Sequence, residues 1–153
     1  MDMKTRFFLM AALCLLTISC ISTKSTLKNV DDSAPNLVLN KQNAFVIKNF
    51  ALDEKYGYDK DYPINIFYQT TKNDSINQQR FFNALTGPNG EKIFYKKTGV
   101  CCPFPSTKSV SGAALLDVYE VRWVGQKIPI TLYLNIYEKS PIMVPKGFGL
   151  KTF

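Results

Sequence analysis

The clearest pattern of apolar and polar positions lies late in the chain, at residues 115–137. Two runs, 115–124 and 128–137, are rich in β-branched and aromatic residues and are separated by three residues that include Gly125. In the second run apolar residues occupy every other position: Ile128, Ile130, Leu132, Leu134 and Ile136. Because successive side chains of a strand point to opposite faces, this alternation places one set toward a core. We predict an antiparallel β-hairpin at 115–137.

Shorter apolar runs predict the rest of the fold. Strand composition occurs at 44–47, 62–68 and 92–97. Residues 73–75 are a helix-start signal, and the helix ends before Gly87. Its apolar face contains Ile76, Phe81, Phe82 and Leu85. Strands and helices do not alternate as they do in parallel α/β folds, so the pattern predicts a small α+β domain. We expect an antiparallel sheet of four to six strands with one short helix.

The first twenty residues carry a separate pattern, that of a bacterial secretory signal. Lys4 and Arg6 precede an apolar-to-small run over 7–19, which ends directly at Cys20. A helix that crosses a membrane needs about 20 apolar residues. Since this run is shorter and a polar stretch follows it, we predict a removable signal peptide at 1–19.

The end of this signal, residues 16–20 (LTISC), resembles a lipobox, the motif that lipoprotein-processing enzymes read. Ser19 is small, as the position before the modified cysteine must be, whereas the usual leucine is displaced by one residue. The resemblance implies a lipid on Cys20, with about 0.8 kcal/mol from each buried methylene. Ile21 in place of an aspartate resembles the pattern of outer-membrane lipoproteins. The alternatives are an ordinary secretory signal and a buried apolar segment.

A polar stretch then separates the cysteine from the domain. Residues 20–36 are rich in Ser, Thr, Lys, Asp and Asn, with Pro35 near the end. This composition predicts a flexible tether with a span of roughly 20–25 Å. The remaining residues, 37–153, are enough for a single domain with its own core.

The sequence of 153 residues contains no histidine. This excludes Ser-His-Asp and Cys-His catalysis, histidine-liganded zinc and the usual general base near neutral pH. We expect no cofactor and predict no catalytic residue. The formal net charge is +7, which favours anionic lipid headgroups near the anchor. A secreted chain rarely meets nucleic acid, so we expect none as a partner.

Cys101 and Cys102 are the most unusual local feature. With Cys14 removed in the signal and Cys20 acylated, the pair has no other cysteine partner. Three states are open: structural cysteines packed as small apolar side chains, a vicinal disulfide, and a soft-metal site. We rank them in that order, because a metal needs more ligands than two neighbours supply.

Other polar and aromatic residues carry weaker signals. Asp117 and Glu120 lie three apart on a strand and therefore point to opposite faces, which indicates solvated charges rather than a catalytic pair. Residues 77–80 (NQQR) begin the helix, where an anion can bind. The tyrosines near 56–68 and at 133 and 137 indicate packing more strongly than ligand stacking.

Four blocks together carry a family resemblance: 80–91 (RFFNALTGPNGE), 99–104 (GVCCPF), 116–121 (LDVYEV) and 145–148 (PKGF). They resemble a family of small uncharacterised lipoproteins of Gram-negative envelopes, over most of the chain after about Tyr56. The shared motifs are structural, and the resemblance implies no functional residues. Some members bear the name 2-dehydro-3-deoxyphosphooctonate aldolase. The enzyme of that name is similar to a (β/α)₈ barrel, which takes about 250 residues and has a strand-helix alternation that this chain lacks.

These observations lead to functional hypotheses of different classes. The first is a non-enzymatic lipoprotein, in the outer membrane, that binds or assembles an envelope protein, for example by strand addition to a sheet edge. The second is a thiol-dependent envelope enzyme that uses Cys101 and Cys102. The aldolase is a distant third.

Overall fold

The predicted hairpin forms the middle of the main sheet. In the computed structural model, which describes residues 25–67 and 75–153, β5 (Ala113–Trp123) pairs antiparallel with β6 (Ile130–Asn135). Both strands follow the predicted runs closely, because the alternation of apolar positions and the Gly125 turn agree on one register. The hairpin prediction is confirmed.

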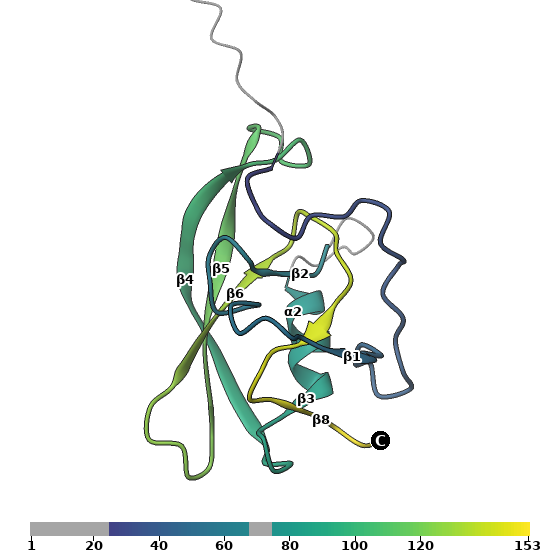
Figure 1. Ribbon diagram of the computed structural model, residues 1–153, viewed down its shortest axis with the longest axis vertical. Coiled ribbons are helices and arrows are strands. Elements are labelled where there is room, and N and C mark those ends of the chain that lie inside the picture. The colour runs from purple at the N-terminus through teal and green to yellow at the C-terminus, as the bar shows by residue number, and fades with distance from the viewer. Residues whose placement is uncertain (1–24, 68–74) are drawn as a thin grey trace, which may run out of the picture.

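Two further strands complete a sheet with the order β2-β6-β5-β4. β4 (Ile93–Pro105) pairs antiparallel with β5, and together they form the long twisted ribbon of Figure 1. β2 (Ile64–Asn65) runs parallel to β6. A sheet of four strands was predicted and is present. It is mixed rather than wholly antiparallel, because the long chain between β2 and β6 permits a parallel crossover.

Four short strands make two small sheets that are separate from the main sheet. β1 (Asn49–Phe50) pairs parallel with β7 (Met143–Val144). β3 (Leu85–Thr86) pairs antiparallel with β8 (Gly149–Leu150). Each pairing joins the C-terminal part of the chain to an earlier segment. Together with one short helix, these sheets give the α+β fold that the sequence predicts.

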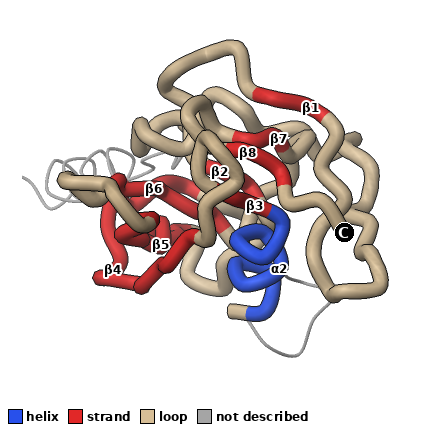
Figure 2. The backbone as a smooth tube through the Cα atoms, turned by 90° about the horizontal axis from the view of Figure 1, so that it is seen from below, coloured by secondary structure: helices blue, strands red, loops and turns tan. Residues whose placement is uncertain are grey.

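The helix, α2 (Ile76–Ala84), lies beside the sheet (Figure 2). Ser75 occupies the N-cap position without a side-chain capping bond, whereas the predicted start at 73–74 lies outside the described residues. The helix ends where Leu85 turns to an extended conformation and enters β3. Gly87 follows β3, so the helix stops two residues earlier than the turn signal indicates.

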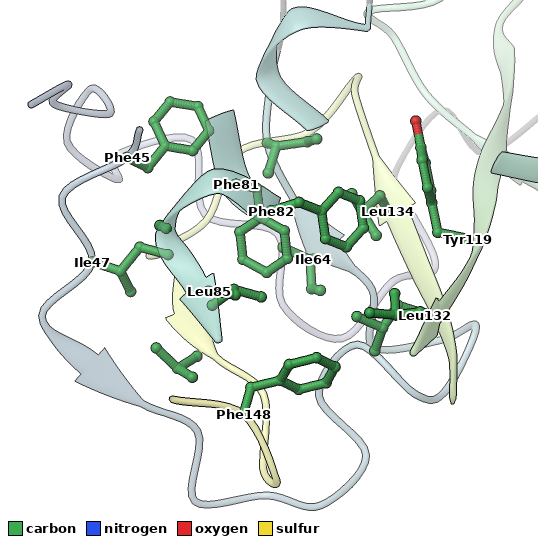
Figure 3. Close-up of a cluster of buried hydrophobic side chains, with 14 of the residues drawn as sticks. Phe45, Ile47, Ile64, Phe81, Phe82, Leu85, Tyr119, Leu132, Leu134 and Phe148 are labelled. Atoms are coloured by element: carbon green, nitrogen blue, oxygen red, sulfur yellow. The ribbon is translucent and has the colours of Figure 1, made fainter. Parts of the chain in front are cut away.

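The main core fills the space between α2 and one face of the sheet (Figure 3). Phe81 and Phe82 of the helix are buried, as the predicted apolar face requires. The Phe82 ring stacks on Tyr95, with 4.2 Å between centroids, and lies 5.0 Å from the ring of Tyr119. Leu134 of β6 is fully buried in the same core. The alternating residues of the hairpin therefore face the helix.

A second, smaller cluster lies on the opposite face of β5. Its four buried residues are Leu27, Phe104, Ala114 and Leu116. Ala114 and Leu116 occupy the even positions of the strand, while Tyr119 and Val121 of the main core occupy odd positions. The covered face of β5 thus changes along the length of one strand.

The N-terminal segment covers this second face. Leu27 and Ala34 are buried, and the Lys28 amide donates to the Asp61 carbonyl at 2.9 Å. The Asn29 side-chain amide donates to the Pro63 carbonyl at 2.7 Å. Over 25–36 the chain is therefore packed, where the sequence predicts a flexible tether. The segment is polar in composition, but a few apolar residues and a set of hydrogen bonds attach it to the domain, and the composition alone does not indicate them.

One further strand prediction differs from the structure, and the signal-peptide prediction lies outside the described residues. Residues 44–47 were predicted as a strand, but Phe45 forms only an isolated bridge to Leu39, although its side chain is buried. The signal at 1–19 and Cys20 lie outside the described residues and stay predictions. No helix within 25–67 and 75–153 is long and apolar enough to cross a membrane.

Candidate functional site

β4 is an edge strand with an unusually long exposed run. It contains 13 residues, and within the described residues β5 is its one neighbour in the sheet. Residues 94–100 are all exposed. In an antiparallel edge strand, alternate N–H and C=O groups point away from the neighbour and are available to another chain. This run is the candidate functional site.

The side chains along this edge are basic and apolar. Lys92, Lys96 and Lys97 lie at its beginning. Phe94 is 48% exposed and Val100 is 54% exposed. The ammonium of Lys92 lies 5.4 Å from the centre of the Phe94 ring. The edge thus offers positive charge together with apolar surface, and this combination suits an extended partner with acidic and apolar side chains.

One of these lysines is attached to the core. Lys97 Nζ lies 2.6 Å from Asp117 Oδ1, and Gln78 Nε2 donates to Asp117 Oδ2 at 2.8 Å. Asp117 is only 6% exposed, so its interpretation as a solvated strand charge was wrong. It lies on the face of β5 that the helix covers, while Glu120 points to the opposite face and pairs with Arg122. The predicted separation of the two carboxylates is thereby confirmed.

The cysteine pair lies at the far end of the exposed run. A disulfide joins Cys101 and Cys102, and both residues are half-buried. The state that we ranked second is therefore the one in the structure, ahead of two packed thiols. No group of three or more His, Cys, Asp or Glu residues that could hold a metal occurs in the described parts of the chain.

The disulfide coincides with a β-bulge. The register passes from Cys101 opposite Leu116 to Phe104 opposite Ala114, so Cys102 and Pro103 share the single partner position at residue 115. Cys102 has φ +60°, in the left-handed region, which costs an L-residue about 1–2 kcal/mol. A residue before proline also favours the extended region. Two local preferences of Cys102 therefore oppose its observed conformation.

Packing holds Cys102 on the second cluster. The residue lies against a group of apolar side chains that includes Leu27, Phe104 and Leu116. Cys101 is not part of this cluster. The two cysteines thus differ in surroundings: Cys102 packs against the second cluster, whereas Cys101 is not among the residues that pack against it.

A buried ion pair lies close to the same cluster. Glu138 is 4% exposed and accepts hydrogen bonds from Ser106 Oγ at 2.6 Å and Lys108 Nζ at 2.8 Å. Lys108 also pairs with Asp32 of the N-terminal segment. Burial alone lowers the pKa of Lys108, but its hydrogen bonds to Asp32 and Glu138 outweigh this and raise the pKa above the ordinary value. The carboxylate is engaged on both oxygens, which indicates a structural role.

An open cleft of about 520 Å³ runs beside this ion pair. Its walls include Leu27, Lys28 and Asp32 from the N-terminal segment and Glu138 from across the fold. The two carboxylates on the walls, Asp32 and Glu138, both pair with Lys108. Both carboxylates of the cleft are therefore engaged within the protein.

The other sequence candidates serve the fold. Asn77 Nδ2 donates to the carbonyls of Ile66 and Phe67, and Arg80 donates to Asn43 and Asn77. These donors at the helix start are used within the protein and do not form the anion site considered from the sequence. Their role is to attach α2 to the chain around it.

The aromatic residues near the N-terminal half pack, as predicted. Tyr56 is buried, its ring makes an edge contact with Tyr62 at 5.4 Å, and its hydroxyl accepts from the Met143 amide at 3.1 Å. Burial raises the pKa of Tyr56 above its ordinary value, and burial also raises the pKa of Tyr58 to about 12. The Tyr58 hydroxyl donates to the Lys146 carbonyl. Both tyrosines join the chain near residue 57 to its C-terminal part.

Sequence reasoning missed the length of the edge strand. The sequence predicts a strand at 92–97 only, and Gly99, Pro103 and Pro105 follow this run. In the structure they continue β4 with a bulge. Prolines are tolerated on an edge strand, and their presence was itself the available signal for an edge.

No protein-family model, curated protein sequence or solved structure matches this chain. The resemblance to envelope lipoproteins therefore stays a prediction, and the functional argument depends on the geometry of β4 and its cysteine pair.

Proposed function

We propose that this protein is a lipid-anchored envelope protein, attached through Cys20, which binds an extended segment of a partner protein by strand addition at β4. The observation that carries the proposal is the exposed run 94–100 on an edge strand with one neighbour in the described sheet. Strand addition uses main-chain hydrogen bonds for affinity and side-chain contacts for specificity. It requires no catalytic group, in keeping with a chain that has no histidine.

The charge of the edge favours one kind of partner. Lys96 and Lys97 lie near the middle of the exposed run 94–100, so they would approach their counterparts if two copies of β4 paired antiparallel about that middle. Lysines on an edge strand are a known protection against such self-pairing. An acidic segment meets no such repulsion. The partner is therefore a strand-forming segment in which acidic residues alternate with β-branched or aromatic ones.

The binding experiment uses the full-length protein and a defined peptide. A fluorescent ten-residue peptide that alternates Glu with Val is titrated with the protein, and anisotropy reports binding. Lys96→Glu is expected to weaken binding about fivefold or more, because it places like charges together. Lys41→Glu, an exposed lysine in a loop away from β4, is the matched control and leaves binding unchanged.

A second peptide tests the mode of binding. The same sequence with N-methyl groups on all of its backbone amides keeps its charges but has no N–H to donate on either edge, so it should not bind. Equal binding of both peptides would show simple charge attraction and would refute strand addition. Equal weakening by Lys96→Glu and Lys41→Glu would refute the assignment to β4.

The anchor has its own test, independent of the edge. Intact mass of the protein extracted from its membranes should show a diacylated chain that begins at Cys20. A chain that begins elsewhere, without lipid, would remove the proposed location and leave the binding proposal to the peptide experiment.

A further inference from the structure

The cysteine pair limits how much of the β4 edge is available. Residues 94–100 are exposed and form a regular part of the strand except near Thr98, whereas the bulge at Cys102 and Pro103 interrupts the ladder. The disulfide lies directly between these two parts. Any change in its state therefore acts at the end of the proposed binding edge.

The conformation of Cys102 indicates that the disulfide and the local chain favour different states. With φ +60°, the residue is in a region that an L-residue rarely adopts. Pro103 favours an extended conformation for the residue before it. An eight-membered ring of two adjacent cysteines restricts the backbone, while two free thiols do not. Without the bond, both local preferences of Cys102 favour the extended region.

We propose that Cys101–Cys102 is a reversible redox-modification site for a protein dithiol, and that its reduction lengthens the edge of β4 available for strand addition. The effect on binding rests on the function proposed above. Reduction lets Cys102 extend, so the exposed run continues past Val100 toward Pro103. The oxidised form keeps the bulge and ends the binding edge at Cys101.

The chemical step is ordinary thiol–disulfide exchange. A thiolate of the reductant attacks one sulfur, the S–S bond breaks, and a mixed disulfide forms while the other cysteine leaves as a thiolate and takes a proton. The second thiol of the reductant then attacks the mixed disulfide and releases the first cysteine. Two electrons and two protons pass to the pair, and the reductant becomes a disulfide.

The surroundings of the pair favour attack at Cys101. Both cysteines are half-buried, but Cys102 also packs against the cluster formed by Leu27, Phe104 and Leu116. Cys101 is half-buried at the edge of the sheet and outside that cluster. Attack at Cys101 Sγ expels Cys102, which is the residue whose backbone is then released.

The first test follows the redox state and the backbone without any peptide. The full-length protein is equilibrated in dithiothreitol buffers of graded ratio, and intact mass after alkylation gives the reduced fraction. Conversion should be reversible and involve both cysteines together. Hydrogen exchange at the amides of Cys102 and Phe104 should change with reduction, while amides of β6 keep their protection. A pair that resists reduction in the folded protein, or unchanged exchange at both amides, would overturn the proposal.

The second test measures how tightly peptides of two lengths bind the β4 edge in each redox state. A ten-residue Glu-Val peptide should bind the reduced protein about tenfold more tightly than the oxidised protein, because it gains backbone pairings. A six-residue version, which fits within the run already exposed, should not distinguish the two forms. Cys101→Ser and Cys102→Ser should both bind as the reduced protein does, in any redox buffer.

The outcomes separate the two proposals. If neither peptide binds in any state, strand addition fails, and the exchange data alone decide the redox site. If both peptides bind but the affinity of the longer one does not depend on the redox state, binding at the edge is supported and its control by the disulfide is refuted. A serine variant that remains redox-sensitive would also refute it.

Discussion

The two apolar clusters on opposite faces of β5 differ in what they hold together. The main core joins α2 to the hairpin and to the C-terminal strands, through side chains such as Phe82 and Leu134. The second cluster has four buried residues, and one of them, Leu27, belongs to the N-terminal segment. The comparison indicates that the main core maintains the fold. The second cluster attaches a segment and the cysteine pair to it.

The largest effect is expected from the main core. Phe82→Ala removes a ring that contacts Tyr95 and Tyr119 and should lower the free energy of unfolding by about 4 kcal/mol. Urea unfolding followed by circular dichroism measures it. Phe50→Ala on β1, where the ring is 54% exposed, is the matched control and should change stability little. Similar losses in both variants would contradict the assignment of the core.

A smaller effect is expected at the buried ion pair beside the second cluster. Glu138→Ala removes the acceptor for Ser106 and Lys108 and should lower the free energy of unfolding by about 2–3 kcal/mol. Glu138→Gln keeps an oxygen for Ser106 and should recover part of this loss. If chemical denaturation finds Glu138→Ala as stable as the wild type, the pair is not a structural support.

A still smaller loss of stability is expected when the N-terminal segment is detached from the second cluster. Leu27→Ala should cost about 1–2 kcal/mol and act mainly by exposing residues 25–34 to protease, while the unfolding of the sheet changes little. Limited proteolysis with mass spectrometry locates the cut. The exposed Leu52→Ala serves as control and should leave the cleavage pattern intact. A global loss of stability in Leu27→Ala would mean that the two clusters are one unit.

Alkaline pH should lower the free energy of unfolding through two tyrosines that pack on the main core, and this effect is absent at neutral pH. The pKa of Tyr58 is raised to about 12 and that of Tyr56 is also raised, in both cases because burial disfavours the phenolate. The folded protein therefore holds these protons more tightly than the unfolded chain. Their contribution is fully present below about pH 10 and is lost as the pH rises from there through the folded pKa values. Tyr58→Phe should make the stability profile above pH 10 flatter, and a profile identical to wild type would contradict this.

The hairpin and the helix face could be predicted because each depends on a local pattern. Alternation over 128–137 and the turn at Gly125 act within one stretch of chain, and Phe81 and Phe82 are at helical spacing. The parallel pairing of Ile64 with Leu134 could not be predicted, since no local pattern encodes it. Such pairings depend on the packing of the whole core.

The candidate site was predicted only in part. The cysteine pair was recognised, but its state depends on the backbone at Cys102, which the sequence does not fix. The strand predicted at 92–97 is the first part of the edge, but its continuation to Pro105 was not predicted. The packing at Leu27 was hidden by its polar neighbours. In each of these cases a tertiary contact outweighs the composition of the local segment.

The pairing of β7 and β8 with β1 and β3 has a consequence for the order of folding. Val144 pairs with Phe50, and Leu150 pairs with Leu85, so the two contacts join residues that lie 94 and 65 positions apart in the sequence. A topology of such high contact order forms slowly, because long loops must close before the contacts that reward them. The two small sheets are therefore expected to form after the local hairpin of β5 and β6.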